Sequence, residues 1–558
     1  MAFDLVIRNG LIVDGTGGPG YEGDVAIEGD KVAAIGKGLA SGREEIDAGG
    51  NVIAPGFIDP HTHMDLFLVL YPHGNPVVNF GVTTVVIADC GASVAPVPDG
   101  NEPVQVLVNY LRRVLDDYID DRLWQWKTFP EYLGYLKGKV GINAAAFVPH
   151  SPVRLSVMGE AAWQREAQPE ELEAMQRVVR EGLEAGAIGF STSPRGGPAV
   201  HAGTPSTFAT QDELVTLGNL AAEYDGSFQF NGFNNILSPS SGFPDLLSRI
   251  RARMIGNEFR LHPGEPNEGA RSIAFMDELA KRGQNMTGVV IPYTHIRRFG
   301  VDDAFIFDGL PTWEAIKGSP DELRRQLGDS NVRRKLEAER IDGAGNPEFP
   351  GWAGWGSVVF DRMESPELKK LEGKTVAEVA QARGEAPADV FFGNWLADDL
   401  RSRMLYYGLA NHDLEELAEM IVSPYSLIGT DAGAHLDRFF WYGTPARLLG
   451  HWQRERGLLT LEEAVHKLTG FPAAKLGINR GRLKVGWPAD VTVFDPDTFG
   501  DLVSERLPAK VDSEEVQRHP PGMEAVVVNG SVVLRHGQSL DTYPGKVTRQ
   551  ELSPPVPA

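Results

Sequence analysis

The chain has 558 residues, 42% of them hydrophobic and 23% charged, so it is long enough to bury a large globular core. Its net charge of −23 argues against nucleic acid or an anionic membrane surface as a partner. The single cysteine excludes an intrachain disulfide, and with no secretory signal or long apolar run evident we expect a cytoplasmic protein.

Both ends of the chain are rich in short β-branched runs separated by turn residues. These runs lie at 5–13, 24–35, 489–494 and 525–534. Asn-Gly pairs favour hairpin turns, which predicts hairpins at Asn9-Gly10 and Asn529-Gly530. We therefore expect a small β-sandwich built from residues 1–55 and 476–548, followed by a disordered tail at 549–558.

Residues 56–475 alternate strand-like runs with helical patterns. Strands are predicted at 82–88, 141–148 and 187–191, and helices at 169–185 and 461–468. This alternation favours a distorted TIM (β/α)₈ barrel, with an open doubly wound sheet as the alternative. No Gly-x-Gly-x-x-Gly turn follows a strand, which disfavours the open sheet. Residues 285–365 break the alternation and are interpreted as an insertion over the barrel mouth, either fixed or a mobile lid.

The run Ala-Pro-Gly-Phe-Ile-Asp-Pro-His-Thr-His at 54–63 is the most informative segment. In an extended strand His61 and His63 point to the same face, where both imidazoles can bind one divalent cation. Nitrogen ligands suit zinc and its neighbours. Alone, however, such a pair is more often two solvated histidines.

Cys90 and Asp431 also follow predicted strands. The active sites of barrels of this type are built at the carboxyl ends of the strands, so these side chains are candidates to meet the histidines. Taken singly, a buried cysteine is usually inert packing, and an aspartate in such a position is usually a turn former.

Several motifs resemble known families. Segments 54–63, 81–86, 427–431 and 481–491 resemble signatures of the metal-dependent amidohydrolase superfamily. Segments 89–96, 148–154 and 186–193 are similar to those of its N-acyl-D-amino-acid deacylases, the D-aminoacylases. The resemblance spans nearly the whole chain and implies a barrel that carries a metal site.

The resemblance also implies roles for individual residues. His61, His63 and Asp431 would surround a zinc ion, and Cys90 matches the cysteine ligand of D-aminoacylases. Asp431 would be the catalytic general base and acid. One or two zinc ions are expected as the cofactor.

The chain departs from the family pattern at two later strands. Asn231 stands where D-aminoacylases have a further zinc histidine, and only His262 is available, as a weak candidate, for the next one. The strand 187–191 carries no lysine that could bridge two metals. A mononuclear or altered site is therefore expected.

Four further side chains are candidates for contact with substrate or for support of the metal ligands, in addition to Asn231. They are His150, Arg195, His295 and His435. The histidines follow predicted strands or lie in polar loops, and a guanidinium can bind a carboxylate through two hydrogen bonds.

The resulting hypothesis is metal-assisted hydrolysis of a non-peptide amide bond, like that of an N-acyl-D-amino acid deacylase. An amidohydrolase acting on another substrate, such as an aryl or xenobiotic amide, a carbamate or a lactone, is the first alternative. A non-catalytic barrel relative is the second. The expected partner is a small-molecule amide, with homo-oligomer formation left open.

Overall fold

An eight-stranded parallel sheet forms the centre of the computed structural model, which describes residues 2–98, 125–194, 204–232, 236–237, 242–342, 354–433, 441–501 and 520–548. In spatial order the strands are β17 (Ser426–Ile428), β13 (Met286–Val290), β12 (Arg253–Asn257), β11 (Ser227–Asn231), β10 (Gly189–Thr192), β9 (Asn143–Pro149), β8 (Val82–Ile87) and β6 (Phe57–Asp59). Beyond β6 and β17 the pairing continues between β7 (Thr62–His63) and β18 (Ala432–Gly433). The predicted barrel is confirmed.

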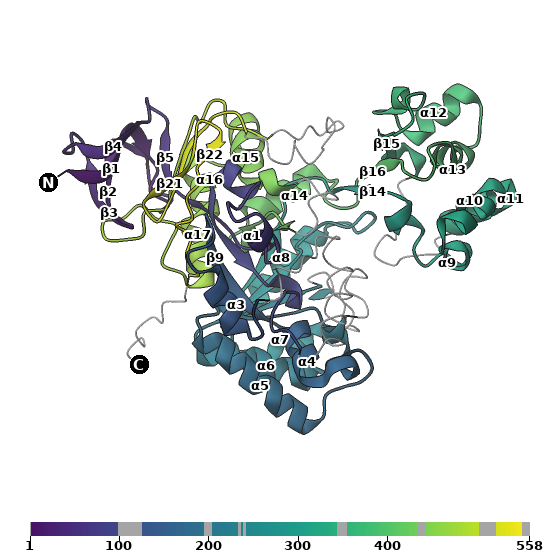
Figure 1. Ribbon diagram of the computed structural model, residues 1–558, viewed down its shortest axis with the longest axis horizontal. Helices are drawn as coiled ribbons and strands as arrows, with labels where there is room; N and C mark the ends of the chain where they lie inside the picture. The colour runs from purple at the N-terminus through teal and green to yellow at the C-terminus, as the bar shows by residue number, and fades with distance from the viewer. Residues whose placement is uncertain are drawn as a thin grey trace.

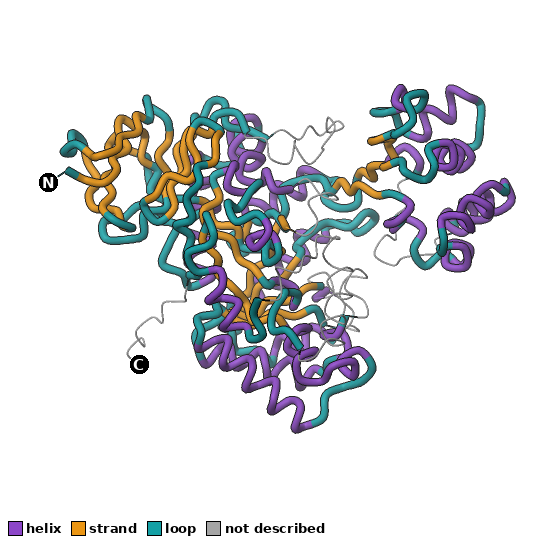
Figure 2. Tube along the Cα trace, in the orientation of Figure 1, coloured by secondary structure: helices purple, strands orange, loops and turns teal. Residues whose placement is uncertain are grey.

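Helices pack along the outside of these strands (Figures 1 and 2). They are α1 (Phe67–Leu70), α3 (Phe129–Leu136), α4 (His150–Met158), α5 (Pro169–Glu184), α6 (Gln211–Glu223), α7 (Phe243–Ser248), α8 (Glu268–Lys281), α14 (Leu414–Val422), α15 (Thr444–Ala446), α16 (Leu461–Leu468) and α17 (Gly470–Leu476). Strands β8 and β9 are buried along their whole length, as expected for parallel strands covered on both faces.

The two predicted helices are confirmed as α5 and α16, and their caps explain where they begin. Pro169 occupies the first turn of α5, where its missing N–H costs nothing. Thr460 accepts a hydrogen bond from the backbone of Glu463 at the start of α16, and Glu463 caps Thr460 in return.

Strands from both ends of the chain form one nine-stranded sheet. They are β1 (Phe3–Ile12), β2 (Tyr21–Glu28), β3 (Lys31–Gly36), β4 (Gly42–Asp47), β5 (Val52–Pro55), β19 (Val491–Phe494), β20 (Met523–Val528), β21 (Ser531–Arg535) and β22 (Gln538–Ser539). Edge strand β3 exchanges backbone hydrogen bonds with the segment before β19, from Val32 to Trp487 and from Gly486 to Val32. The sheet therefore curls around its own apolar core.

The turn at Asn529-Gly530 is confirmed, but the hairpin predicted at Asn9-Gly10 is wrong. Strand β1 continues through both residues, with a register shift against β2 between Ile7 and Gly10. The N–H of Asn9 donates to the Asp24 side chain at 3.0 Å instead of to a strand backbone. The Asn-Gly pair therefore forms a bulge in place of a turn.

A separate unit lies between β13 and β17. It contains β14 (Ile296–Phe299), α9 (Pro311–Ile316), α10 (Pro320–Gly328), α11 (Ser330–Ile341), β15 (Val358–Arg362), α12 (Val376–Arg383), α13 (Pro387–Ala397) and β16 (Arg403–Tyr407). Its three strands form their own sheet, and an aromatic-rich core of its own packs beneath them. Figure 1 shows its helices to the side of the barrel, away from the terminal sheet.

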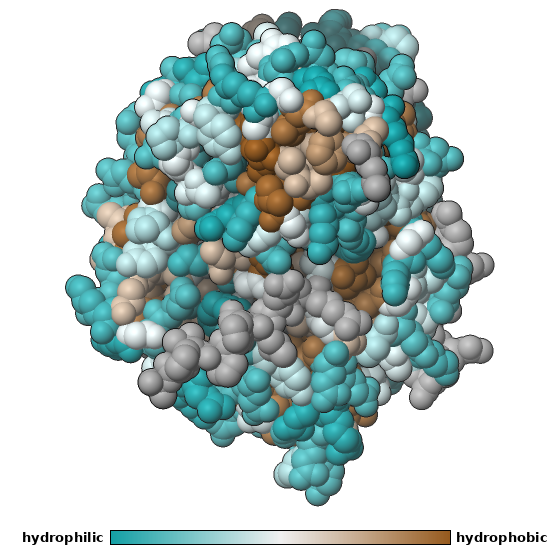
Figure 3. All heavy atoms as spheres, turned by 90° about the vertical axis from the view of Figure 1, so that its left-hand side faces the viewer, coloured by the Kyte–Doolittle hydropathy of each residue, from teal (hydrophilic) through white to brown (hydrophobic). Residues whose placement is uncertain are grey.

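The expected insertion at 285–365 overlaps this unit, although its first residues fall in or next to β13. The lid role and the domain boundaries at 1–55, 56–475, 476–548 and 549–558 stay predictions, and the tail lies outside the described residues. Within the described ranges, every helix is too short or too polar to span a lipid bilayer. The surface on the side of the terminal sheet is mostly hydrophilic, with hydrophobic areas among the polar ones (Figure 3).

Candidate metal centre

The first barrel strand carries the two histidines to the mouth of the barrel. Strand β6 ends at Asp59, His61 follows two residues later, and His63 ends the short strand β7, which pairs with β18 after β17. Both imidazoles are buried, and their ring centroids lie 5.4 Å apart at 88°. This edge-to-face arrangement turns both rings toward one point, as the alternation along the extended segment predicts.

Cys90 and Asp431 meet the histidines at that point. The Sγ of Cys90 lies 3.5 Å from Nε2 of His61, and the ligand atoms of Cys90 and the two histidines all lie within 4.8 Å of one another. One oxygen of Asp431 lies 3.4 Å from Nε2 of His61 and 3.3 Å from Nε2 of His63. The four side chains therefore form one compact cluster, in which His61, His63 and Cys90 are buried and Asp431 is partly exposed.

Asp89 orients the ring of His61. Its Oδ1 lies 3.3 Å from Nδ1 of His61, while its Oδ2 accepts a hydrogen bond from the N–H of Thr62. A carboxylate on Nδ1 leaves Nε2 facing the cluster, which is how metal-binding histidines are usually held. Asp89 is fully buried, so this contact is shielded from solvent.

Cys90 lies in a turn whose backbone conformation is rare for residues other than glycine. Ala88 and Cys90 have φ values of 61° and 56°, in the left-handed region. Such residues cost on the order of 1–3 kcal/mol each and persist only where the surroundings hold them. Here the side chain of Gln229 accepts the N–H of Cys90 at 2.8 Å.

Strand β10 supplies the other supports of this turn. The hydroxyl of Ser193 donates to the carbonyl of Cys90 at 2.7 Å, and that of Ser191 donates to the carbonyl of Ala88 and accepts the N–H of Gly91. Gly91 has a φ of +69°, and a Cβ there would lie 2.9 Å from the backbone of Thr192. The turn is therefore fixed against β10.

Asp431 is held by the closure of the barrel. Its φ is 53°, and its N–H donates to the carbonyl of His61 at 3.1 Å. The preceding Thr430 donates through its N–H and hydroxyl to Asp59. Burial raises the pKa of Asp59 to about 7, although these hydrogen bonds oppose the shift.

The charges within the cluster oppose one another. Burial disfavours the imidazolium forms of His61 and His63, but the anionic groups around the two rings outweigh burial. These groups hold the pKa of His61 well above its ordinary value and raise the pKa of His63 to about 10. The same imidazoles, acting against burial, lower the pKa of the Cys90 thiol and hold the pKa of Asp431 well below its ordinary range. The cluster thus places anionic ligand atoms around a point where positive charge is stabilised. A divalent cation fits such a point.

Amide side chains face this cluster from the next strands. Asn231 ends β11 beside Asn257, its register partner at the end of β12. The amide of Asn257 lies 3.6 Å from the Sγ of Cys90, and that of Gln229 lies 4.0 Å from it. Sequence reasoning missed Asn257 and Gln229, because only the strand register shows that they reach Cys90.

His262, the weak candidate, pairs with Glu268 at 2.9 Å. Glu258 comes directly after Asn257, is only slightly exposed and pairs with Arg260 at 2.7 Å. Burial raises the pKa of Glu258 although Arg260 opposes it, and Asp431 adds to the rise. Glu258 is a further carboxylate near Asp431 that the sequence motifs did not indicate.

His150 lies at the end of β9, as predicted, in a separate buried cluster. Its ring nitrogens lie 2.8 Å from Thr192 and 2.8 Å from Glu213, which also binds Arg154. Burial lowers the pKa of His150 although Glu213 opposes the shift. A role for His150 in catalysis stays a prediction.

His295 follows β13 and is buried, with its ring 4.3 Å from that of Trp441. Asp431 is among the charged groups that act on its pKa, so the two side chains are close enough to interact electrostatically. Arg195 and His435 lie outside the described residues.

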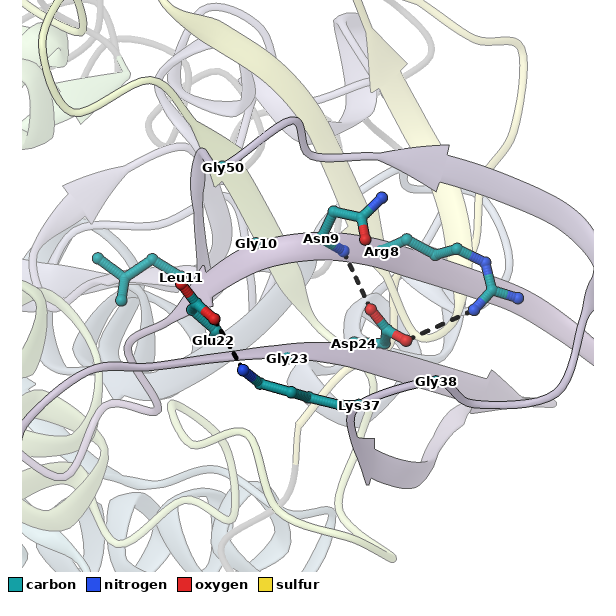
Figure 4. A pocket seen from close by; sticks show the side chains of 10 residues that line it. All are labelled: Arg8, Asn9, Gly10, Leu11, Glu22, Gly23, Asp24, Lys37, Gly38 and Gly50. Carbon is teal, nitrogen blue, oxygen red and sulfur yellow. Dashed lines mark hydrogen bonds and ion pairs between the residues drawn. The ribbon is translucent and has the colours of Figure 1, made fainter.

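A separate hollow of about 550 Å³ lies on the terminal sheet and is lined by residues between Arg8 and Gly50, none of which belongs to the cluster. Figure 4 shows Asp24 bound by the N–H of Asn9, and Lys37 paired with Glu22. Since these groups satisfy one another, we assign the hollow no role in the metal centre.

Comparison with models of protein families identifies the family of this chain. The model of the amidohydrolase family matches residues 44–282 and 354–534. The chain belongs to the amidohydrolase family. The resemblance read from its motifs is confirmed, and the unmatched gap, residues 283–353, covers β13 and the first part of the unit that follows it.

Two relatives match over their full lengths. A D-aminoacylase of Alcaligenes xylosoxydans xylosoxydans is 29% identical over 98% of this chain and 97% of its own. An N-acyl-D-glutamate deacylase of the same organism is 29% identical over 99% and 97%. These two relatives are thus amide hydrolases of D-amino-acid derivatives.

A solved structure gives the same picture. The N-acyl-D-glutamate deacylase of Bordetella bronchiseptica, complexed with zinc and a phosphonate mimic of the tetrahedral intermediate, superposes with a TM-score of 0.69 at 25% identity. That match covers 98% of this chain and 100% of the deacylase. A crystal structure of D-aminoacylase gives a TM-score of 0.67 at 25% identity over 98% and 100%.

Proposed function

We propose that this chain is a zinc-dependent hydrolase that cleaves the amide bond of an N-acyl-D-amino acid. The observation that carries the proposal is the convergence of the buried side chains of His61, His63 and Cys90 with the partly exposed Asp431 at the barrel mouth. Family membership and the names of the relatives support the reaction class.

The donor set supports zinc as the cofactor. Two imidazoles and a thiolate are borderline-soft ligands, and the lowered pKa of the Cys90 thiol favours its ligating form. His61, His63, Cys90 and Asp431 would hold the ion. When bound, zinc would act as a Lewis acid on the scissile carbonyl and lower the pKa of the attacking water.

Asp431 would move the proton. Its carboxylate accepts the proton of the attacking water and then passes it to the leaving nitrogen, as general base and then general acid. The left-handed backbone at Asp431 and its N–H bond to the carbonyl of His61 support this role by fixing the backbone that carries the carboxylate. Asp89 keeps Nε2 of His61 turned to the ion.

We propose one zinc ion per chain. Asn231 and Asn257 end the strands where relatives of this subgroup are expected to have zinc histidines, and a neutral amide nitrogen is not a zinc ligand. A D-aminoacylase structure is described by its binuclear metal centre, with one-metal activation and second-metal attenuation. For that enzyme, activation by one metal is compatible with a single working ion.

The proposal also includes a small-molecule amide as partner and a cytoplasmic location. The high negative charge and the single cysteine support both, because they disfavour polyanionic partners and disulfide-forming compartments.

The test is a substrate panel on protein stripped of metal and titrated with zinc. We expect hydrolysis of N-acetyl-D-amino acids but not of their L-enantiomers, rising to a maximum at one zinc per chain. Preference for an aryl amide, or no zinc-dependent hydrolysis of any N-acyl-D-amino acid, would overturn the proposal.

A further inference from the structure

His295 is fixed in place at the barrel mouth. Its backbone N–H donates to the carbonyl of Ala410 at 2.9 Å, and its carbonyl accepts the N–H of Leu409. Its ring packs against Trp441 with centroids 4.3 Å apart, and the side chain is 1% exposed. The orientation of the imidazole is therefore set by the segment that returns from β16.

Asn411 determines which ring nitrogen of His295 carries the proton. The N–H of Leu261 donates to Oδ1 of Asn411 at 2.8 Å, so this end of the amide is the oxygen. The amide nitrogen then faces the carbonyl of Ile291 at 3.0 Å and Nε2 of His295 at 3.2 Å. Because an amide nitrogen only donates, Nε2 must accept, and a neutral ring carries its proton on Nδ1.

The surroundings keep the ring neutral. Burial, Arg260 and His262 together hold the pKa of His295 well below its ordinary value, and Asp431 alone opposes them. A neutral imidazole with one fixed N–H is a directed hydrogen-bond donor, a role that neutral histidines fill beside substrate carbonyls in other enzymes.

The donor atom has no acceptor within the described part of the chain: Nδ1 of His295 is buried and makes no hydrogen bond there. Leaving a buried N–H unsatisfied costs free energy, which a bound ligand that accepts its hydrogen bond would recover. The side chain also lies within electrostatic reach of Asp431, where the scissile bond is expected.

We propose that the Nδ1–H group of His295 donates a hydrogen bond to an oxygen of the bound substrate, either of the scissile carbonyl or of the carboxylate. This inference rests on the proposed function. Asn411 is then a positioning residue, because it selects the tautomer without touching substrate.

Variants at His295 separate the donor from the side chain. His295→Leu removes the N–H, and we expect kcat/KM to fall about 10²–10³-fold, the range for loss of an oxyanion donor. His295→Asn keeps an N–H near the Nδ1 position and should recover most of that loss. His466→Leu is the control, since His466 bonds to Gly15 beside the terminal sheet.

Kinetics also separate the two oxygens. A fall in kcat with weaker binding of a phosphonate inhibitor supports the carbonyl. A rise in KM, with lost discrimination between the substrate and its carboxamide, supports the carboxylate. Unchanged kcat and KM in His295→Leu, at wild-type zinc content, overturn the inference.

A tautomer measurement provides a readout other than activity. Long-range ¹H–¹⁵N spectra of the imidazoles, with the His295 signals identified by their loss in His295→Asn, should show protonated Nδ1 in the free enzyme. Asn411→Asp offers Nε2 an acceptor and should shift the proton to it. Protonated Nε2 in the wild type contradicts the inference, whereas wild-type protein inactive on every N-acyl-D-amino acid contradicts the proposed function instead.

Discussion

The two halves of the barrel mouth differ in the chemistry at their strand ends. Around β6, β8 and β17 the side chains are ionisable: the ligand atoms of His61, His63 and Cys90 lie within 4.8 Å of one another, and Asp431 lies 3.3–3.4 Å from both histidines. Around β11 and β12 they are neutral amides, with Asn257 directed at the Cys90 sulfur. The barrel thus combines a half suited to a cation with a half suited to hold the thiolate by hydrogen bonds.

This difference explains how a barrel related to binuclear enzymes can keep its fold while holding the single metal ion proposed here. Replacing a ligand by an amide of similar shape keeps the strand ends polar and hydrogen-bonded, so the barrel closes as before. If the two halves differ in this way, substitutions around β6, β8 and β17 should change charge and metal affinity far more than substitutions around β11 and β12.

Asp431→Asn should produce the largest change. The variant keeps the shape of the side chain but removes the proton acceptor, so kcat should fall about 10²–10⁴-fold with the fold retained. Steady-state kinetics and circular dichroism measure this. Asn231→Ala is the matched change in the amide half and should cost less than about tenfold in kcat; equal losses would remove the distinction between the halves.

Cys90→Ala should weaken zinc affinity by about 100-fold or more, because loss of groups that only support a ligand already costs 10–100-fold. Ser193→Ala keeps the thiolate but frees the carbonyl of Cys90, and should cost about tenfold. Competition with a chromophoric chelator measures both. Wild-type affinity in Cys90→Ala would remove the cysteine from the ligand set.

Asp59→Asn tests the titration of the charged half. Folding raises the pKa of Asp59 from 3.8 to about 7, so the folded state binds more protons between these values. The free energy of unfolding of metal-free protein should therefore fall as the pH rises from about 4 to 7. In Asp59→Asn this fall in the free energy of unfolding should be smaller by on the order of 2–4 kcal/mol, as measured by denaturant titration at several pH values. Parallel curves for the two proteins would contradict the raised pKa.

Asn231→His with Asn257→His should make the amide half resemble the charged one. Two added imidazoles beside Cys90 should raise bound zinc from one to two ions per chain, with little change in stability. Metal analysis after gel filtration measures the count, and Asn231→His alone is the control, expected to stay at one. A second ion already present in the wild type would contradict the mononuclear proposal.

Most of the structure that could be predicted from sequence depends on patterns within short segments of the chain. The spacing of His61 and His63 placed them on one face, because alternation in an extended segment needs no distant contact. Pro169 and the Thr460 cap act within one helical turn, so α5 and α16 were predictable from sequence. The hairpin at Asn9-Gly10 failed because Asp24, on another strand, captures the Asn9 N–H.

The site beyond the histidines needed distant contacts. Cys90 reaches His61 only because Gln229 and Ser193, more than 100 residues later, hold its left-handed turn. The same holds for Asn257, whose position beside Cys90 follows from strand register. Neither contact leaves a periodic signal in the sequence.

The sequence by itself determined the donors: two histidines at strand spacing, a lone cysteine, and an aspartate after the last strand, within an alternation that closes into a barrel. The tertiary structure alone decided their convergence, the amides facing Cys90 and the tautomer of His295. The physical reason is range. Spacing and capping act over a few residues, whereas left-handed turns, burial and a fixed imidazole proton depend on partners that only the closed barrel brings together.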